Sequence, residues 1–173
     1  MNTGPELLHA QLRTAGIRMT AGLPDDWLVP LMARIDEDAD MVQVRVAREP
    51  EAVGVCGGAF FGGVPACAIM GFAGLLTCGH EFALFNSAHQ VPLFVLSTLR
   101  GTIEDPRTYQ VAQGLIGAAY LDALQVPHMT IERVEDLDLI QAAYRRSRLV
   151  KRPLVCLISK KVAFHGLGEN YGD

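Results

Sequence analysis

Residues 53–79 contain no charged side chain, and this run constrains the fold more than any other feature of the sequence. The run is long enough to span a bilayer, which needs roughly 20 apolar residues. However, it contains eight glycines and Pro65, which would interrupt a membrane helix. We therefore interpret it as a buried helix, a turn and a buried strand, and we expect no membrane span. A strand that is apolar on both sides is typical of a parallel sheet with helices on both faces.

Apolar runs and amphipathic segments alternate along the rest of the chain. The predicted strands are 19–23, 41–46, 65–70, 93–97, 128–132 and 153–158, and the predicted helices are 5–15, 27–35, 49–62, 75–90, 110–124 and 135–148. Residues 71–74 and 98–109 are predicted loops. Six strands that alternate with helices predict a doubly wound, three-layer α/β fold with a parallel sheet of about six strands. We expect one domain over residues 1–173, with a core at 5–160 and a polar tail at 161–173.

The composition argues against several classes of function. The formal net charge is −4 and aromatic residues make up 7% of the chain, so we expect no nucleic-acid partner. The N-terminus lacks a basic region followed by an apolar run, which predicts a cytoplasmic protein. The histidines lack metal-ligand spacing. The cysteines form no Cys-x-x-Cys pair and are expected to be buried, reduced thiols: Cys56, Cys67, Cys78 and Cys156.

Polar side chains follow several of the predicted strands. Asp25 and Asp26 follow the first strand, Glu49 follows the second and Arg100 follows the fourth. Ligands bind beyond the carboxyl ends of the strands of an open parallel sheet, so these residues are candidates for a site. Glu49 is the most informative, because its helix carries no charge after Glu51. It is either a functional carboxylate in a poorly solvated position or a helix-start residue that complements the helix dipole.

A glycine-rich segment at residues 57–63 (GGAFFGG) could suggest a phosphate-binding loop. It lies in or at the end of a predicted helix instead of between a strand and a helix start, and it lacks the Gly-x-Gly-x-x-Gly spacing. Close backbone packing, against the sheet or against a helix of another subunit, explains it better. A nucleotide-binding module is therefore a weak alternative.

Several segments together resemble a known family. They are residues 21–26 (AGLPDD), residues 48–63 (REPEAVGVCGGAFFGG), Gly74, and residues 99–101 (LRG). In order and spacing they resemble the pyrimidine-binding domain of thiamine diphosphate-dependent enzymes. The resemblance extends over residues 5–160 and is closest to the separate α subunit of sulfopyruvate and phosphonopyruvate decarboxylases.

The resemblance implies a decarboxylase of 2-oxo acids that uses thiamine diphosphate. Glu49 corresponds to the activating glutamate of the family, with Glu51 as the nearby competitor. In the family this carboxyl group hydrogen-bonds the aminopyrimidine ring and favours the imino tautomer, which deprotonates the thiazolium carbon. Pro24 and Gly74 are the other expected cofactor contacts.

Further site residues are expected around these positions. Asp26 and His80 are candidate catalytic groups, although Asp26 could be a helix cap and His80 a helix residue bonded to a neighbour. Arg100 could pair with an anionic substrate or form a surface ion pair. The family carries amide side chains near Gly74, which this chain lacks, so a less polar 2-oxo acid is also possible as substrate. The expected substrate contacts are Asp25, Phe72, Thr77 and Arg100.

The resemblance also implies a partner chain. The family binds the diphosphate through a divalent metal held by a Gly-Asp-Gly segment and a later Asn, and no such segment occurs here. We therefore expect no metal ligand in this chain and a diphosphate-binding β subunit that carries Mg²⁺. The uncharged helix over residues 52–63 is the expected interface, in an α₂β₂ or higher assembly.

Two other functions are compatible with the same resemblance. The first is the corresponding half of a carboligase similar to acetolactate synthase, which uses the same activated cofactor to join two carbonyl compounds. The second is a non-catalytic pyrimidine-domain subunit with a role in assembly or regulation.

Overall fold

One parallel sheet organises the fold. The computed structural model describes residues 2–103, 105 and 107–168. Its six strands lie in the order β2-β1-β3-β4-β6-β5, and each neighbouring pair is parallel. The predicted six-stranded parallel sheet is thus confirmed. The strands are β1 (Met19–Gly22), β2 (Val42–Arg45), β3 (Ala66–Met70), β4 (Leu93–Thr98), β5 (His128–Ile131) and β6 (Pro153–Ile158).

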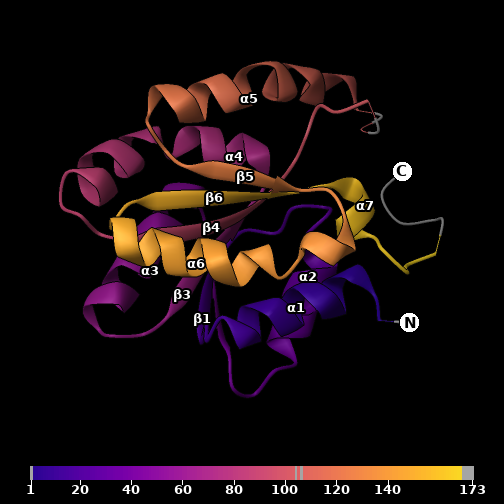
Figure 1. Cartoon of the computed structure of the whole chain (residues 1–173), viewed down its shortest axis with the longest axis horizontal. Helices are drawn as coiled ribbons and strands as arrows, with labels where there is room; N and C mark the ends of the chain where they lie inside the picture. The colour runs from indigo at the N-terminus through magenta and orange to yellow at the C-terminus, as the bar shows by residue number, and fades with distance from the viewer. Residues whose placement is uncertain (1, 104, 106, 169–173) are drawn as a thin grey trace.

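Helices cover both faces of the sheet, which completes the predicted three-layer α/β fold (Figure 1). Right-handed crossovers explain which helices lie on which face, because connections that run in opposite directions along the sheet place their helices on opposite faces. One layer contains α1 (Gly4–Thr14), α2 (Val29–Asp36) and α6 (Leu139–Val150). The other layer contains α3 (Glu49–Phe61), α4 (Phe72–Thr77), the π-helix η1 (Glu81–Ser87) and α5 (Val111–Ala123).

The segment after β3 differs from the prediction. Residues 71–74, predicted as a loop, include the start of α4. Gly71 caps this helix, because its carbonyl oxygen accepts a hydrogen bond from Leu75 N–H at 3.0 Å. The single helix predicted for 75–90 is divided into α4 and the π-helix η1. The ring of Phe85 in η1 packs on Gly57 of α3, where a Cβ atom would overlap it.

The C-terminal part of the described chain is more ordered than predicted. Helix α7 (Lys160–Ala163) lies largely in the predicted polar tail, and the Ser159 hydroxyl caps it by accepting a hydrogen bond from Val162 N–H. Val162 and Ala163 are buried in the same core as α1 and α2, so the core extends beyond residue 160. The rest of the predicted tail, residues 169–173, lies outside the described residues. Two short 3₁₀ helices are also present, η2 (Thr108–Gln110) and η3 (Val134–Asp136).

The uncharged run of residues 53–79 is divided among α3, β3 and α4. Among the described residues, no helix is both long and apolar enough to cross a membrane. The four cysteines are free and buried, as predicted. Burial raises the pKa of Cys56 and Cys156 to about 12, so these thiols are neutral at physiological pH.

Candidate active site

Glu49 lies at the carboxyl edge of the sheet, where β2 leads into α3. Its side chain rests on Gly74 of α4, where a Cβ atom would overlap the carboxyl group. Glycine at position 74 therefore allows the carboxylate to occupy this place. Within the described part of the chain, no donor is hydrogen-bonded to the Glu49 carboxylate. This half-buried carboxylate is therefore open to a hydrogen-bond donor from outside the chain.

Glu51 has a different environment. Its Oε2 accepts hydrogen bonds from Ala47 N–H at 2.9 Å and Arg48 N–H at 3.3 Å. These bonds form part of a capping box at the start of α3. The two candidate glutamates are thus distinguished by their contacts, because Glu51 binds the backbone of its own helix and Glu49 does not.

Cys78 lies near Glu49, and Tyr120 lies beside Cys78. The Cys78 thiol donates a hydrogen bond to Gly74 O at 3.4 Å. Burial raises the pKa of Cys78 to about 12, and the charges of Glu81 and Glu49 act in the same direction. Tyr120 donates to Leu76 O at 2.8 Å, and burial raises its pKa as well. The thiol and the phenol are therefore neutral at physiological pH.

Asp25 and Arg100 form a second group at this edge of the sheet. Nη2 of Arg100 donates to both carboxylate oxygens of Asp25, at 3.2 and 3.3 Å, and Nη1 lies 3.7 Å from Oδ2 of Asp105. The Arg100 guanidinium also stacks on Trp27, 3.9 Å from the ring centroid. Arg100 is only 2% exposed. It forms a buried ion pair, which corrects the alternative of a surface ion pair.

This buried group connects three loops. The Asp25 carboxylate lies against Gly71, where a Cβ atom would stand 2.5 Å from Oδ2, and it accepts a hydrogen bond from Trp27 N–H. Asp105 accepts from Gly101 N–H at 3.2 Å. The loops after β1, β3 and β4 are therefore held together at the edge where Glu49 also lies.

Asp26 lies outside this buried group. Its carboxylate pairs with Arg107, which also donates to the Tyr109 hydroxyl at 3.1 Å. The Asp26 side chain is 55% exposed. The helix-cap alternative for Asp26 is wrong, since Leu28 occupies the N-cap position of α2 and the N–H of Trp27 in the preceding turn is accepted by Asp25.

The remaining predicted site residues, of which Phe72 and Thr77 belong to α4, have separate surroundings. The ring of Phe72 is buried and packs beneath Gly117 of α5, so the structure gives it a packing role in place of the predicted substrate contact. Thr77 is exposed, and its hydroxyl donates to Gly74 O at 2.7 Å. His80 is exposed and makes no hydrogen bond within the described chain, so the alternative of a bond to a neighbour is wrong. Pro24 is exposed beside Asp25.

Sequence reasoning missed four residues that shape these environments. Trp27 and Asp105 enclose Arg100, Cys78 lies near Glu49, and Tyr120 lies beside Cys78. The only signal for Trp27 was its position beside Asp25 and Asp26. The partners of Arg100 come from loops distant in sequence, so no local pattern could have identified them.

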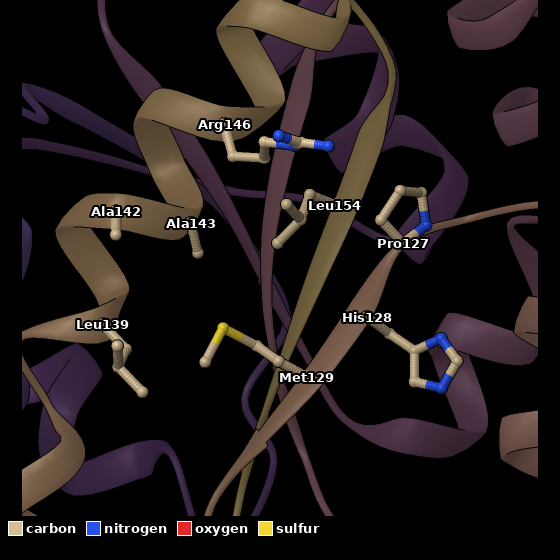
Figure 2. A pocket seen from close by; sticks show the side chains of 8 residues that line it. All are labelled: Pro127, His128, Met129, Leu139, Ala142, Ala143, Arg146 and Leu154. Carbon is tan, nitrogen blue, oxygen red and sulfur yellow. The ribbon is translucent and has the colours of Figure 1, made fainter.

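Two cavities lie apart from Glu49. An apolar groove of about 320 Å³ lies between the edge strand β5 and α6, with Met129, Leu139 and Leu154 along it and Arg146 at one end (Figure 2). A second cavity, of about 380 Å³, lies at the carboxyl ends of β4, β5 and β6 and is lined in part by Leu99, Ile103 and Glu132. Neither includes Glu49.

The residues around Glu49 fit the aminopyrimidine half of thiamine diphosphate, the cofactor that the family resemblance implies. An aminopyrimidine ring needs one carboxylate without a protein donor and backbone that allows close approach, and Glu49 with Gly74 provides both. In the described ranges, no cluster of three or more His, Cys, Asp or Glu side chains could hold a metal ion. A diphosphate–magnesium site is therefore not assigned to the described residues.

Comparison with known structures supports the fold. The chain superimposes on a 2-oxoglutarate:ferredoxin oxidoreductase from Magnetococcus marinus with a TM-score of 0.72 at 14% identity. The match covers 94% of this chain and 30% of the oxidoreductase chain, so this chain corresponds to a part of that protein. It is thus a three-layer α/β domain of the kind found in a 2-oxo acid oxidoreductase.

The sequence comparisons identify more specific relatives. The chain is 21% identical to the sulfopyruvate decarboxylase subunit alpha of Methanococcus maripaludis, over 88% of this chain and 92% of the relative. It is 28% identical to the same subunit of Methanothermobacter thermautotrophicus, over 72% and 76%. A phosphonopyruvate decarboxylase of Streptomyces viridochromogenes is 33% identical over 54% of this chain and 24% of its own length.

These matches confirm the predicted resemblance to sulfopyruvate and phosphonopyruvate decarboxylases. No protein-family model matches the chain. The relatives are decarboxylases, and several are named as alpha subunits, which supports a decarboxylase subunit that has a partner.

Proposed function

We propose that this chain is the α subunit of a two-component, thiamine diphosphate-dependent decarboxylase of a 2-oxo acid. Sulfopyruvate, phosphonopyruvate or a less polar analogue is the proposed substrate, in agreement with the names of the relatives. The observation that carries the proposal is the Glu49 carboxylate, which lies on Gly74 at the carboxyl edge of the sheet and has no donor within the described chain.

Glu49 is the proposed proton-holding group. Its carboxyl group shares a proton with a ring nitrogen of the aminopyrimidine, and the start of α3 stabilises its negative charge. Bound thiamine diphosphate supplies the electron sink that makes loss of carbon dioxide possible. The Cys78 thiol near Glu49 donates to Gly74 O and not to the carboxylate, which leaves Glu49 available to a donor from the cofactor.

Arg100 is proposed to act through Asp25. Its guanidinium is buried between Asp25 and Asp105, so it is not free to bind a substrate anion directly. Instead it holds Asp25 beside Gly71, at the edge where the substrate would enter. We therefore assign Asp25 to the substrate side of the site and Arg100 to its positioning. Asp26, more exposed and paired with Arg107, is a secondary candidate for proton transfer.

The partner is proposed to cover α3. Gly54 and Gly58 lie inside this helix, and a Cβ atom at either position would meet nothing within 4 Å. A glycine inside a helix costs about 1 kcal/mol relative to alanine, and no contact among the described residues requires it at these two positions. Close approach of another backbone would explain both glycines. We propose that a diphosphate-binding β subunit, which carries Mg²⁺, lies against this surface and completes the site of Glu49.

The test is a pair of isosteric substitutions in the complex of both subunits. Glu49→Gln should lower turnover by about 10²–10⁴-fold, the range of an acid–base contribution, with no loss of stability. Glu51→Gln keeps a capping side chain and should retain activity within a few-fold. Carbon dioxide release and urea unfolding measure the two effects. Equal activity losses in both variants, or full activity of Glu49→Gln, would refute the proposal.

A further inference from the structure

The groove between β5 and α6 exists because α6 does not extend over the edge of the sheet. Helix α6 packs on β4 and β6, whereas β5 is the last strand in the sheet order, beyond β6. The side chain of Met129 in β5 faces the layer of α6 but is only partly buried there. On the helix side, Ala142 and Ala143 leave the space open, because their side chains end at Cβ.

The groove has one charged end. Of the described residues that line it, His128 and Arg146 have polar side chains. Nδ1 of His128 lies 3.1 Å from Val126 O, and Figure 2 shows the imidazole ring directed away from α6. The Arg146 side chain instead extends from α6 towards the strand side of the groove (Figure 2). Its guanidinium forms no ion pair or hydrogen bond within the described ranges, so it is available to a ligand.

The surroundings of Arg146 favour an anion. The chain carries a formal net charge of −4, yet residues 145–152 contain five cations and no acidic residue. In the part of the chain that the structure describes, none of these cations forms an ion pair: Arg145, Arg146, Arg148, Lys151 and Arg152. Together they outweigh the partial negative charge of about half a unit at the C-terminus of α6. Unpaired charges of one sign raise the local concentration of a ligand of the opposite sign.

The volume of the groove limits the size of the ligand. At about 30 Å³ for each small group, which is the share of a water molecule in the liquid, 320 Å³ holds roughly ten non-hydrogen atoms. A protein partner would need about 800 Å² of contact and would cover the exposed Arg145 and Arg148, which an apolar surface cannot solvate. A small ligand leaves both cations in water. The groove therefore fits a small molecule better than a protein surface.

We propose that this groove binds a small amphipathic carboxylate. Its apolar body lies against Met129, Leu139 and Leu154, and its carboxylate pairs with Arg146. The planar guanidinium binds a carboxylate through two parallel hydrogen bonds, which fixes the orientation of the ligand. A straight chain of about eight carbon atoms matches the volume, because octanoate has about ten non-hydrogen atoms.

The proposed carboxylate site is separate from the candidate active site. Arg146, Pro127 and Leu154 lie at the amino ends of β5 and β6, whereas Glu49 lies at the carboxyl edge of the sheet. A ligand in the groove therefore does not occupy the surroundings of Glu49. The inference does not depend on the proposed decarboxylase.

The experiment titrates the ¹⁵N-labelled full chain with octanoate and follows its amide NMR signals. The signals of Met129 and Ala142 should shift and saturate with a dissociation constant in the millimolar range, as expected for about ten ligand atoms. Hexanoate should bind up to about 15-fold more weakly, because each buried methylene contributes up to about fourfold. Octan-1-ol has the same apolar chain without the charge and should bind about 5–10-fold more weakly.

Three variants test the assignment of the residues. Arg146→Gln should weaken octanoate binding by about 5–10-fold. Arg145→Gln is the matched control, since it removes the same charge from a neighbouring exposed position that does not line the groove. It should change the affinity by less than about twofold. Ala142→Trp fills the groove from an exposed helix position and should prevent binding. Circular dichroism checks that each variant is folded.

Several outcomes would overturn the inference. Shifts that do not saturate at millimolar octanoate, or that map to other elements, would show that the groove is not a binding site. Equal affinities for octanoate and octan-1-ol would exclude the carboxylate contact, and equal weakening by both arginine variants would exclude the specific role of Arg146. Unchanged binding in Ala142→Trp would place the ligand elsewhere. If octanoate does not bind and Ala142→Trp prevents association with the proposed β subunit, the groove is a protein interface instead.

Discussion

The contact between Gly74 and Glu49 can be tested by adding one methyl group. In Gly74→Ala, the new Cβ atom would stand 2.1 Å from Cδ and Oε1 of Glu49 and 2.3 Å from Cγ. Carbon atoms in ordinary contact are at least about 3.5 Å apart. The carboxyl group must therefore move by roughly 1.4 Å, because it is the flexible partner and the methyl group is fixed to the helix. Gly74 is not among the glycines with positive φ, so alanine fits the backbone.

The expected effects on activity and stability have opposite signs. A displacement of about 1 Å in a catalytic group can lower the rate by about 10²-fold, which corresponds to about 2.7 kcal/mol in the barrier. In contrast, alanine in place of glycine inside a helix raises the free energy of unfolding by up to about 1 kcal/mol. A variant that is no less stable but about 100-fold slower cannot be explained by general destabilisation.

The assay compares four proteins in the complex with the β subunit, thiamine diphosphate and Mg²⁺. They are the wild type, Gly74→Ala, Glu49→Gln and the double variant, and release of carbon dioxide from sulfopyruvate or phosphonopyruvate measures turnover. If Gly74 acts only through Glu49, the double variant should be no slower than Glu49→Gln. Full activity of Gly74→Ala, or multiplicative losses in the double variant, would show that the contact does not position a catalytic carboxylate.

Three further outcomes are expected. Arg100→Met should lower the free energy of unfolding by about 3–5 kcal/mol in urea titrations, because Asp25 and Asp105 lose their buried counter-charge. Gly58→Ala should raise the stability of the isolated chain by up to about 1 kcal/mol and weaken binding of the β subunit in calorimetric titrations, since its Cβ atom has space only in the isolated chain. Hydrogen bonds from Arg13 lower the pKa of Asp38 to about 2. This carboxylate therefore stabilises the fold above its ordinary unfolded pKa of about 3.9, and the contribution is lost as the pH falls towards 2. The difference in Tm between the wild type and Asp38→Asn should accordingly shrink between pH 4 and pH 2.

The sheet was predictable because its signal is local. Each strand is a short apolar run between turn residues, and the alternation with helices determines that the strands are parallel. The place of Glu49 was also predictable, because the carboxyl end of β2 and the start of α3 are defined by adjacent residues. By contrast, α4 begins at Phe72 because its N–H donates to the Thr98 hydroxyl, a residue 26 positions away.

The side chains around the candidate site also depend on contacts between residues that are distant in sequence. The family resemblance placed Phe72 and Arg100 beside the substrate, and both follow strands at the correct edge. The structure turns Phe72 beneath Gly117 and Arg100 towards Asp25, 75 positions earlier in the chain. Sequence position thus identifies the edge at which a residue lies. The direction of its side chain depends on partners that only the folded chain brings together.

The first turn of α3 contains two carboxylates, Glu49 and Glu51, that make different contacts. Glu49 and Glu51 are two residues apart, which separates them by about 200° around the helix. Glu51 reaches back to the free N–H groups of residues 47 and 48, while Glu49 extends over Gly74. A helix start stabilises a carboxylate but does not by itself desolvate it, and strong acid–base function needs a site from which water is excluded. The isolated chain leaves Glu49 half-buried beside a surface of glycine and other small residues. Under the proposed function, the catalytic environment of Glu49 should therefore form only when another surface covers α3, and the proposed β subunit would then be part of the active site.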